Sequence, residues 1–508
     1  MARTASDTLY QLIHSLDRTE KGYVKKFFAQ HVIGDENDYV LLFEAIDALE
    51  EPNEQVLRES LAGSRMLSRL PAVKNYLYQR ILEAMRVYHA SKSPEREIVE
   101  LLLDADFLWE KTHYEQAMVR IRKAKELARR YDEFAFWIKT ISWEKNYRGV
   151  IRESPRFEST TDPLSAEQQH VLSLLQSTLQ YEQIGNLLQH HLMLRAAGNR
   201  SGDEWLRSMP SHELFLNPAM ALSRPAKINY HLILSNWHAF AGGDANTAAN
   251  HAKEILGILE IEPDLTHARP DLELSMLQTY LQRCVDARRF DDYRAMAPRL
   301  WNPTGGKPSK NIDVKRFYRA MSTELGYAIV SGDNQRVLEK IAFMKERYTA
   351  LRAEIPAQSR LSGTFLAARI LIEQNRMREG GWWLREALSE EPNTRLDLHV
   401  AARLLQLRMA ETQKDRALIG SLVRSLARFI KKYSLQAARL DAIVSYYRRI
   451  AELRTDRELQ RIRKETAHKL RAFAQTGMFD PVASAGFDVL FAAHMPPASM
   501  QVESPLNY

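Results

Sequence analysis

The histidines of this sequence have the greatest potential for metal chemistry, but their spacing does not suit a shared ion. His212-Glu-Leu-Phe-Leu216 begins like a helical zinc motif, yet a leucine stands where the second histidine must lie one turn later. His190 and His191 are adjacent, so on a helix their side chains point about 100° apart. His231 and His238 share a helix face two turns apart, which is too far for both to bind one ion directly. The sequence therefore predicts no metal site.

The patterns for phosphate binding, calcium binding and nucleophilic catalysis are also incomplete. Thr304-Gly-Gly-Lys307 lacks the glycine spacing of a phosphate loop, and no strand precedes it. Gly34-Asp-Glu-Asn-Asp38 lacks the alternating ligands and the closing glutamate of a calcium loop. No Gly-x-Ser-x-Gly elbow occurs, and Cys284, the only cysteine, is expected to be a small buried hydrophobe. We therefore predict a non-catalytic protein that uses no cofactor.

The composition favours a soluble chain built from helices. Hydrophobic residues make up 45% and charged residues 27% of the 508 positions, and the 19 prolines and 20 glycines are few enough to allow long helices. Apolar residues recur at helical spacing, and no sustained alternation indicates a strand. No stretch approaches the roughly 18 uninterrupted apolar residues of a membrane span. Residues 1–16 lack the apolar core of a secretory signal. We expect an all-α, cytoplasmic protein without a membrane span.

Residues 101–127 have the pattern of a helical hairpin. Its small and large apolar positions are Ala105, Leu108, Tyr114, Ala117, Ile121, Ala124 and Leu127. Alanine is needed where two helices cross closely, and we predict that Ala124 lies at such a crossing. The pattern resembles the hairpin of the tetratricopeptide repeat.

Further turns follow this hairpin at a regular spacing. The turn positions are Thr112, Gly243, Arg288, Gly332, Asn375 and, more weakly, Lys414. The intervals from Gly243 to Asn375 are 45, 44 and 43 residues, and such periodicity is the signature of repeat folds. The usual tetratricopeptide period is about 34 residues, so HEAT-like repeats, with periods of about 40–47, remain an alternative. The resemblance implies an all-α, right-handed solenoid of helical hairpins with a period of about 44 residues.

We expect four parts along the chain. They are an N-terminal helical unit (1–92), the solenoid (95–430), basic C-terminal helices (431–476), and a capping helix with a tail (477–508). The basic, aromatic helix at 71–90 leaves a helix-turn-helix interpretation open, but the 12 basic and 13 acidic residues of the first part favour a packing role. The chain also resembles a group of uncharacterised bacterial repeat proteins with a similar N-terminal unit, which implies no function.

The resemblance also implies which residues face a partner, because the first helix of each tetratricopeptide hairpin lines a concave groove. The implied groove residues are Asp106, Trp109, Tyr230, Trp237, Arg319 and Arg369, with Ile233, Phe240, Gln278, Gln282, Ser322 and Phe365 beside them. Aromatic and arginine side chains suit an extended peptide with apolar anchors and acidic groups. In the alternative interpretation, Trp237 and Phe240 belong to the core between repeats. We predict a scaffold that binds a protein or peptide segment.

Positive charge is concentrated towards the C-terminus. Residues 403–471 contain 18 basic and 7 acidic residues. Arg424, Arg428, Lys431 and Lys432 form the densest part of this block. Such a patch predicts, as an alternative function, binding of nucleic acid or another acidic surface. A solvated helical face would have the same composition, because Lys and Arg are good helix formers.

Overall fold

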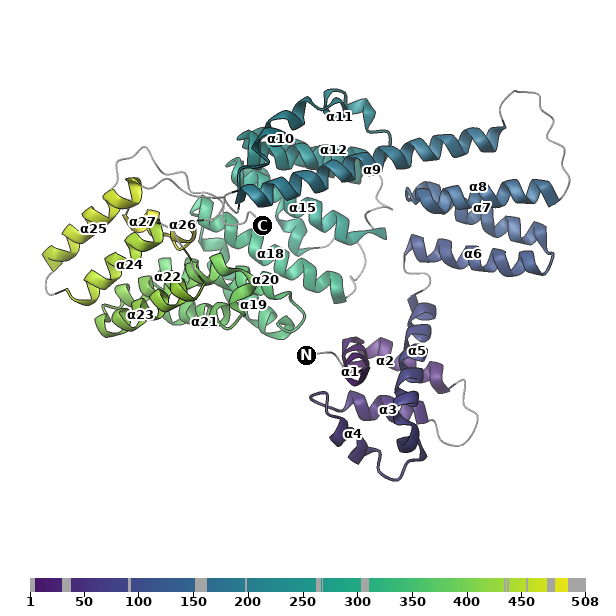
Figure 1. The fold of residues 1–508 in the computed structure, drawn as a ribbon, viewed down its shortest axis with the longest axis horizontal. Coiled ribbons are helices and arrows are strands. Elements are labelled where there is room, and N and C mark those ends of the chain that lie inside the picture. The colour runs from purple at the N-terminus through teal and green to yellow at the C-terminus, as the bar shows by residue number, and fades with distance from the viewer. Residues whose placement is uncertain are drawn as a thin grey trace. The chain divides into compact units, whose positions relative to one another are not determined.

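The structure is a computed structural model. It describes residues 5–29, 38–89, 93–150, 162–196, 199–261, 266, 268–302, 310–433, 435, 438–453, 456–472 and 480–491. These residues form helices and turns and contain no β-strand, so the chain is all-α as predicted (Figure 1). None of the described helices is long and apolar enough to cross a membrane. The chain divides into two compact units, Met1–Leu172 and Ser173–Tyr508.

The first unit begins with a small helical cluster. Its helices are α1 (Ala5–Ser15), α2 (Arg18–Ala29), α3 (Asp38–Asp47), α4 (Glu54–Ser60), the short 3-10 helix η1 (Arg65–Arg69) and α5 (Leu70–His89). α5 buries one face against α1, α2 and α3. Lys74 is on that buried face and forms an ion pair with Glu54, and Arg80 stacks over Phe27. These basic residues of α5 therefore take part in packing, in line with the favoured interpretation of this helix.

The rest of the first unit contains the predicted hairpin. Its helices are α6 (Pro94–Glu110), α7 (Tyr114–Arg130), α8 (Phe134–Val150) and the beginning of α9 (Pro163–Ala196). Ser93 caps α6 by accepting a hydrogen bond from the Arg96 N–H, and Pro94 occupies the first turn. Ala105, Ala117 and Ala124 are fully buried where α6 and α7 pack together. Small side chains at these three buried positions leave room for the close helix crossing that the sequence predicts.

The second unit contains the end of α9 and all later helices. They are α10 (Asp203–Ser208), η2 (Met209–Ser211), α11 (Glu213–Leu216), η3 (Pro218–Met220), α12 (Arg224–Trp237), the π-helical turn η4 (His238–Gly242), α13 (Ala245–Glu260), α15 (Pro270–Asp286), α16 (Phe290–Met296), α17 (Pro298–Trp301), α18 (Lys310–Ser331), α19 (Gln335–Leu351), α20 (Ala357–Glu373), α21 (Met377–Leu388), η5 (Pro392–Thr394), α22 (Leu396–Thr412), α23 (Arg416–Lys432), α24 (Ala438–Ala451), α25 (Asp456–Ala472), α26 (Pro481–Ser484) and α27 (Phe487–Phe491).

The turn positions chosen from the sequence share a left-handed backbone. The φ angles are 63° at Thr112, 71° at Gly243, 55° at Arg288, 77° at Gly332, 59° at Asn375 and 57° at Lys414. In four of these turns, the N–H after the turn residue bonds to a carbonyl five residues earlier, as from Arg376 to Leu371 at 2.8 Å. This is the Schellman closure, which ends one helix and turns the chain towards the next.

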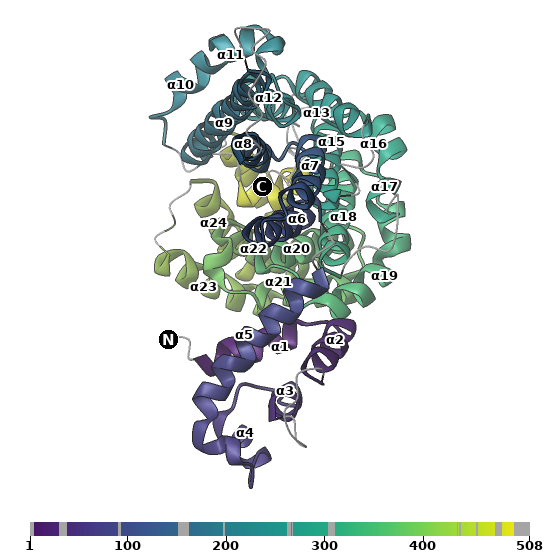
Figure 2. The same cartoon turned by 90° about the vertical axis from the view of Figure 1, so that its right-hand side faces the viewer.

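Four helices of the second unit form a continuous inner layer. α15 packs against α18, α18 against α20, and α20 against α22. Figure 2 shows that the helices follow a curve from α12 through α15 and α18 to α22. The buried apolar residues from α18 to α27 form one continuous core. This arrangement places the same side of each inner helix around a common space.

Candidate functional site

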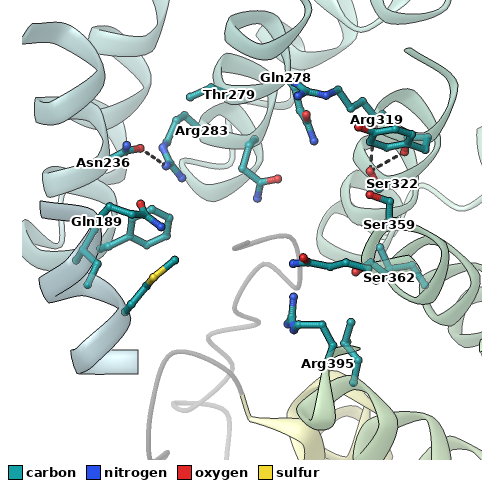
Figure 3. Close-up of a pocket in the computed structure, with 18 of the residues that line it drawn as sticks. Gln189, Asn236, Gln278, Thr279, Arg283, Arg319, Ser322, Ser359, Ser362 and Arg395 are labelled. Atoms are coloured by element: carbon teal, nitrogen blue, oxygen red, sulfur yellow. Dashed lines mark hydrogen bonds between the residues drawn. The ribbon is translucent and has the colours of Figure 1, made fainter. Parts of the chain in front are cut away.

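The inner helices of the second unit surround a cavity of about 570 Å³ (Figure 3). Its walls come from α9, α12, η4, α15, α18, α20 and α22 and from Arg395, the residue before α22. Three arginines line it, Arg283, Arg319 and Arg395, and no aspartate or glutamate of the described residues does. The other polar groups of the lining are amides, hydroxyls and the Tyr318 phenol. The cavity is therefore chemically suited to an acidic group.

Arg283 is the most deeply buried of the three arginines, with 4% of its surface exposed. Its Nη2 donates to Asn236 Oδ1 at 3.0 Å and its Nη1 to Asp286 Oδ2 at 3.0 Å, while Nε has no hydrogen-bond partner among the described residues. Burial lowers the pKa of this guanidinium from its ordinary value, and Asp286 opposes that effect. Burying the charged Arg283 guanidinium therefore costs free energy, and the Asp286 carboxylate offsets only part of that cost.

Arg319 carries the charge that is least compensated. Its Nη1 donates to Ser275 Oγ at 2.7 Å, and it forms no ion pair with a described residue. Arg395, in contrast, donates three hydrogen bonds to Asp397, from Nε at 2.9 and 3.2 Å and from Nη2 at 2.6 Å. A ligand carboxylate would therefore meet an oriented, uncompensated guanidinium at Arg319.

The structure places only some of the expected groove residues at the cavity. Arg319 lines it, and so do Phe240, Gln278, Gln282, Ser322 and Phe365. Tyr230 does not, because it is buried with its ring 5.8 Å from that of Phe215. Trp237 donates from Nε1 to the Leu206 carbonyl at 2.6 Å and packs in the same small core. The alternative interpretation, a core position, therefore describes Trp237 better than the groove does.

Arg369 was also expected to face a partner, and the structure corrects this expectation. Its side chain is 4% exposed, and Nη1 donates to the Ser484 carbonyl at 2.9 Å. Burial lowers the pKa of its guanidinium, and Glu373 opposes that effect. Arg369 is covered because α26 lies over this part of the inner layer.

Asp106 and Trp109 belong to the first unit, whereas the cavity belongs to the second. Asp106 is exposed, and Trp109 packs edge-to-face against Tyr114 and Trp143, with centroid distances of 4.9 and 5.1 Å. The ring of Trp109 therefore fills space within its own helical layers.

Arg283 and Arg395 line the cavity but are not among the groove residues that the resemblance implies. Arg283 directly follows the expected Gln282, so a shift of one residue in helix phase would have found it. Arg395 precedes α22 and lies outside any helical periodicity. Figure 3 shows Arg283, Arg319 and Arg395 entering the cavity from different elements.

The predicted basic patch lies on one exposed face of α23. Arg424, Arg428, Lys431 and Lys432 are all exposed, and the opposite face buries Ile419, Val423, Leu426 and Phe429. The four basic residues form no ion pair with a described residue. Other members of the basic block are used internally, such as Arg408 with Glu373 and Arg463 with Glu411. The exposed charge of α23 is therefore available to an acidic surface.

A histidine cluster joins α12, η4 and α13. His231 Nδ1 lies 3.0 Å from His251 Nδ1, and the His238 ring stacks on His251 with a centroid distance of 5.8 Å. Burial lowers the pKa of all three, and His231 and His238 help to lower that of His251 to about 4. In the described part of the chain, no group of three or more His, Cys, Asp or Glu residues is placed to hold a metal ion.

No known protein family, curated protein or solved structure matches this chain. The site must therefore be interpreted from its own geometry.

Proposed function

We propose that this protein is a non-catalytic interaction scaffold, and that its second unit binds an extended acidic segment of a partner protein in the cavity. The observation that carries this proposal is the lining, in which three arginines face the cavity and no described carboxylate does. An aspartate or glutamate of the partner would supply the missing charge, above all at Arg319. The Asn and Gln amides offer donors and acceptors to a peptide backbone, and Phe240 and Phe365 offer apolar surface.

The proposal includes the finer architecture. We infer a right-handed solenoid of tetratricopeptide-like hairpins with a period of about 44 residues. The shared left-handed turns and the serial packing of α15, α18, α20 and α22 support this inference. A solenoid would extend the lining along several repeats, which suits an extended segment better than a compact ligand.

Selection from a library of random displayed peptides tests the function. We expect the full-length chain to enrich peptides that carry Asp or Glu among apolar residues. Arg319→Glu should weaken their binding about tenfold or more, because it replaces the uncompensated guanidinium with a carboxylate that repels the acidic groups of the peptide. Arg424→Glu is the matched control, since it makes the same charge change on the exposed face of α23. Enrichment of peptides without acidic residues, or binding that Arg319→Glu leaves unchanged, would count against the proposal.

The unpaired basic face of α23 favours nucleic-acid binding as a second candidate function. Binding to phosphates must weaken as salt rises, with a log–log slope of about −0.9 per phosphate contacted. Fluorescence anisotropy with labelled duplex DNA and RNA at low salt measures this. Here the roles of the variants are exchanged, so Arg424→Glu should reduce binding and Arg319→Glu should not. Absence of binding at low salt, or binding insensitive to salt, would eliminate this candidate.

A further inference from the structure

A segment of the chain itself, residues 480–491, packs against helices of the second unit. α26 packs on α22 and α24, and α27 packs on α25 and α26. Residues 480–491 therefore lie against the inner helices instead of extending the stack by another hairpin. The segment thus shows what kind of peptide this surface accepts.

Two phenylalanines anchor the segment. Phe487 and Phe491 are fully buried, and their rings meet Tyr447 and Tyr446 at centroid distances of 6.0 and 5.2 Å. The tyrosine hydroxyls donate to Glu411 at 2.9 and 2.7 Å, so α22 and α24 hold the walls of this aromatic pocket in place. Burial of the two phenylalanine rings favours docking because it removes their apolar surface from water.

Arginines of the inner helices bind the main chain of the segment. Arg369 donates to the Ser484 carbonyl at 2.9 Å, and Arg408 donates to the Ala485 carbonyl. Gly486, between these carbonyls and the first phenylalanine, has a φ of 77°. A Cβ at this glycine would overlap Arg408 Nη1 and Glu373 Oε1. Docking therefore favours glycine here chiefly because of its backbone angle, and a Cβ would in addition push the Arg408 and Glu373 side-chain ends out of their present contacts.

Arg439 binds two acidic groups of the segment, but one of these contacts is imperfect. Its Nη2 donates to Asp488 Oδ1 at 2.7 Å. Its Nε lies 2.7 Å from Asp480 Oδ2 without hydrogen-bond geometry, so this second contact is an ion pair only. Burial raises the pKa of Asp480 despite Arg439. Docking thus removes the Asp480 carboxylate from water, and Arg439 compensates only part of that cost. The incomplete compensation weakens docking and favours replacement of the segment by another peptide.

We propose that the inner face of α20, α22 and α24 is a peptide-binding site, occupied in this structure by residues 480–491 and able to accept a partner segment of the same pattern. The pattern is a glycine followed by two phenylalanines four residues apart, with an aspartate after the first. The tether raises the local concentration of the chain's own segment to the millimolar range, so a partner segment must bind well to displace it. This peptide-binding site is different from the cavity lined by Arg283, Arg319 and Arg395, and the proposal does not depend on that cavity.

A labelled synthetic peptide with the sequence of residues 480–491 tests the proposal against the full-length chain. Gly486→Ala should dislodge the internal segment without changing any residue of α20, α22 or α24. We expect the peptide to bind the Gly486→Ala chain at least about tenfold more tightly than the wild-type chain, because the internal competitor is weakened. A peptide with alanine in place of both phenylalanines should not bind.

Gly332→Ala is the matched control. Gly332 has the same φ of 77°, but a Cβ there meets nothing within 4 Å. The Gly332→Ala chain should therefore bind the peptide no better than the wild-type chain does. A folded Gly486→Ala chain that fails to bind the peptide, or equal binding to all three chains, would overturn the proposal.

A measurement on the wild-type chain covers the case in which Gly486→Ala does not fold. Excess unlabelled peptide should speed hydrogen exchange in residues 480–491 by displacing them, while exchange in α22 and α24 stays slow. Unchanged exchange in the segment at saturating peptide would mean that it is a fixed cap, and the proposal would be wrong.

Discussion

The Arg283 guanidinium lies over the Phe240 ring, with its central carbon 4.6 Å from the ring centroid. The same guanidinium donates to Asn236, so one side chain of α15 holds both α12 and η4 at the edge of the cavity. Stacking and a directed fork of donors are properties of arginine that lysine lacks. The geometry of this wall should therefore depend on the guanidinium and not only on its charge.

We predict that Arg283→Lys destabilises the second unit by about 1–3 kcal/mol, because it removes the stacking and leaves the partly buried Asn236 without its donor. Urea unfolding measures the loss, and hydrogen exchange should localise it to α12 and α15. Arg424→Lys, the exposed control, should change stability by less than about 0.5 kcal/mol. Equal stability of the two variants would show that only the charge of Arg283 matters.

In the turn after α6, glycine substitutions at two adjacent residues should change the stability of the hairpin in opposite directions. Thr112 is exposed and has a φ of 63°, which is unfavourable for a β-branched residue, whereas Lys111 has a φ of −84°. Thr112→Gly should stabilise the α6–α7 hairpin by about 1 kcal/mol, and Lys111→Gly should destabilise it by about 0.5–1 kcal/mol. Hydrogen exchange of residues 94–130 reads out both changes. A loss of protection in Thr112→Gly would contradict the assigned turn conformation.

The histidine cluster predicts sensitivity to acid. Burial, with the neighbouring His231 and His238, lowers the pKa of His251 to about 4, while an unfolded histidine titrates near its ordinary value of about 6.5. Between these values the unfolded chain binds more protons, so the free energy of unfolding must fall as the pH falls through this window. Glu254 and Asp244 oppose the shifts of His231 and His238, respectively, so the effect should be centred on His251.

We expect wild-type stability to fall on the order of 2 kcal/mol more than that of His251→Gln between about pH 7 and pH 5. Urea unfolding at several pH values measures this difference. His190 is exposed, so His190→Gln should retain the wild-type pH dependence. If His251→Gln and His190→Gln lose stability in parallel with the wild-type chain, the cluster does not control the acid response.

Structural features that depend only on neighbouring residues could be predicted from the sequence. The turn at Asn375 could be predicted because asparagine tolerates a left-handed backbone and apolar helical periodicity stops on both sides of it. The buried alanines of the α6–α7 hairpin could be predicted because close helix crossings need small residues. Both features are set within one hairpin, so no information from distant residues was needed.

The site was harder to predict because burial there depends on distant residues. Arg369 has the spacing of a groove residue, but it contacts Ser484, 115 positions along the chain. Tyr230 likewise is covered by Phe215 and Tyr181, which precede the hairpin. Periodicity shows which residues share a helix face, but it does not show which later segment covers that face. The groove residues implied by the repeat resemblance include Arg319, which lines the cavity, and Gln282, which directly precedes Arg283. They also include Arg369, which is buried.

Ala124 leads to a prediction about how far damage spreads through the chain. It is fully buried in α7, and a tryptophan there should overpack the hairpin at a cost of about 1–3 kcal/mol or more. Helical layers that contact only their neighbours keep such damage local. In Ala124→Trp, hydrogen exchange should therefore lose protection in α6, α7 and α8, while helices after residue 311 stay protected.

Arg122→Trp is the control for this substitution, because Arg122 is exposed two residues earlier in the same helix. It introduces the same side chain at the surface and should leave protection in α6 and α8 unchanged. Uniform loss of protection through both units in Ala124→Trp would indicate one cooperative core. That result would contradict the local packing on which the interaction-scaffold proposal relies, because a solenoid must transmit disturbance between adjacent helices before it reaches distant ones.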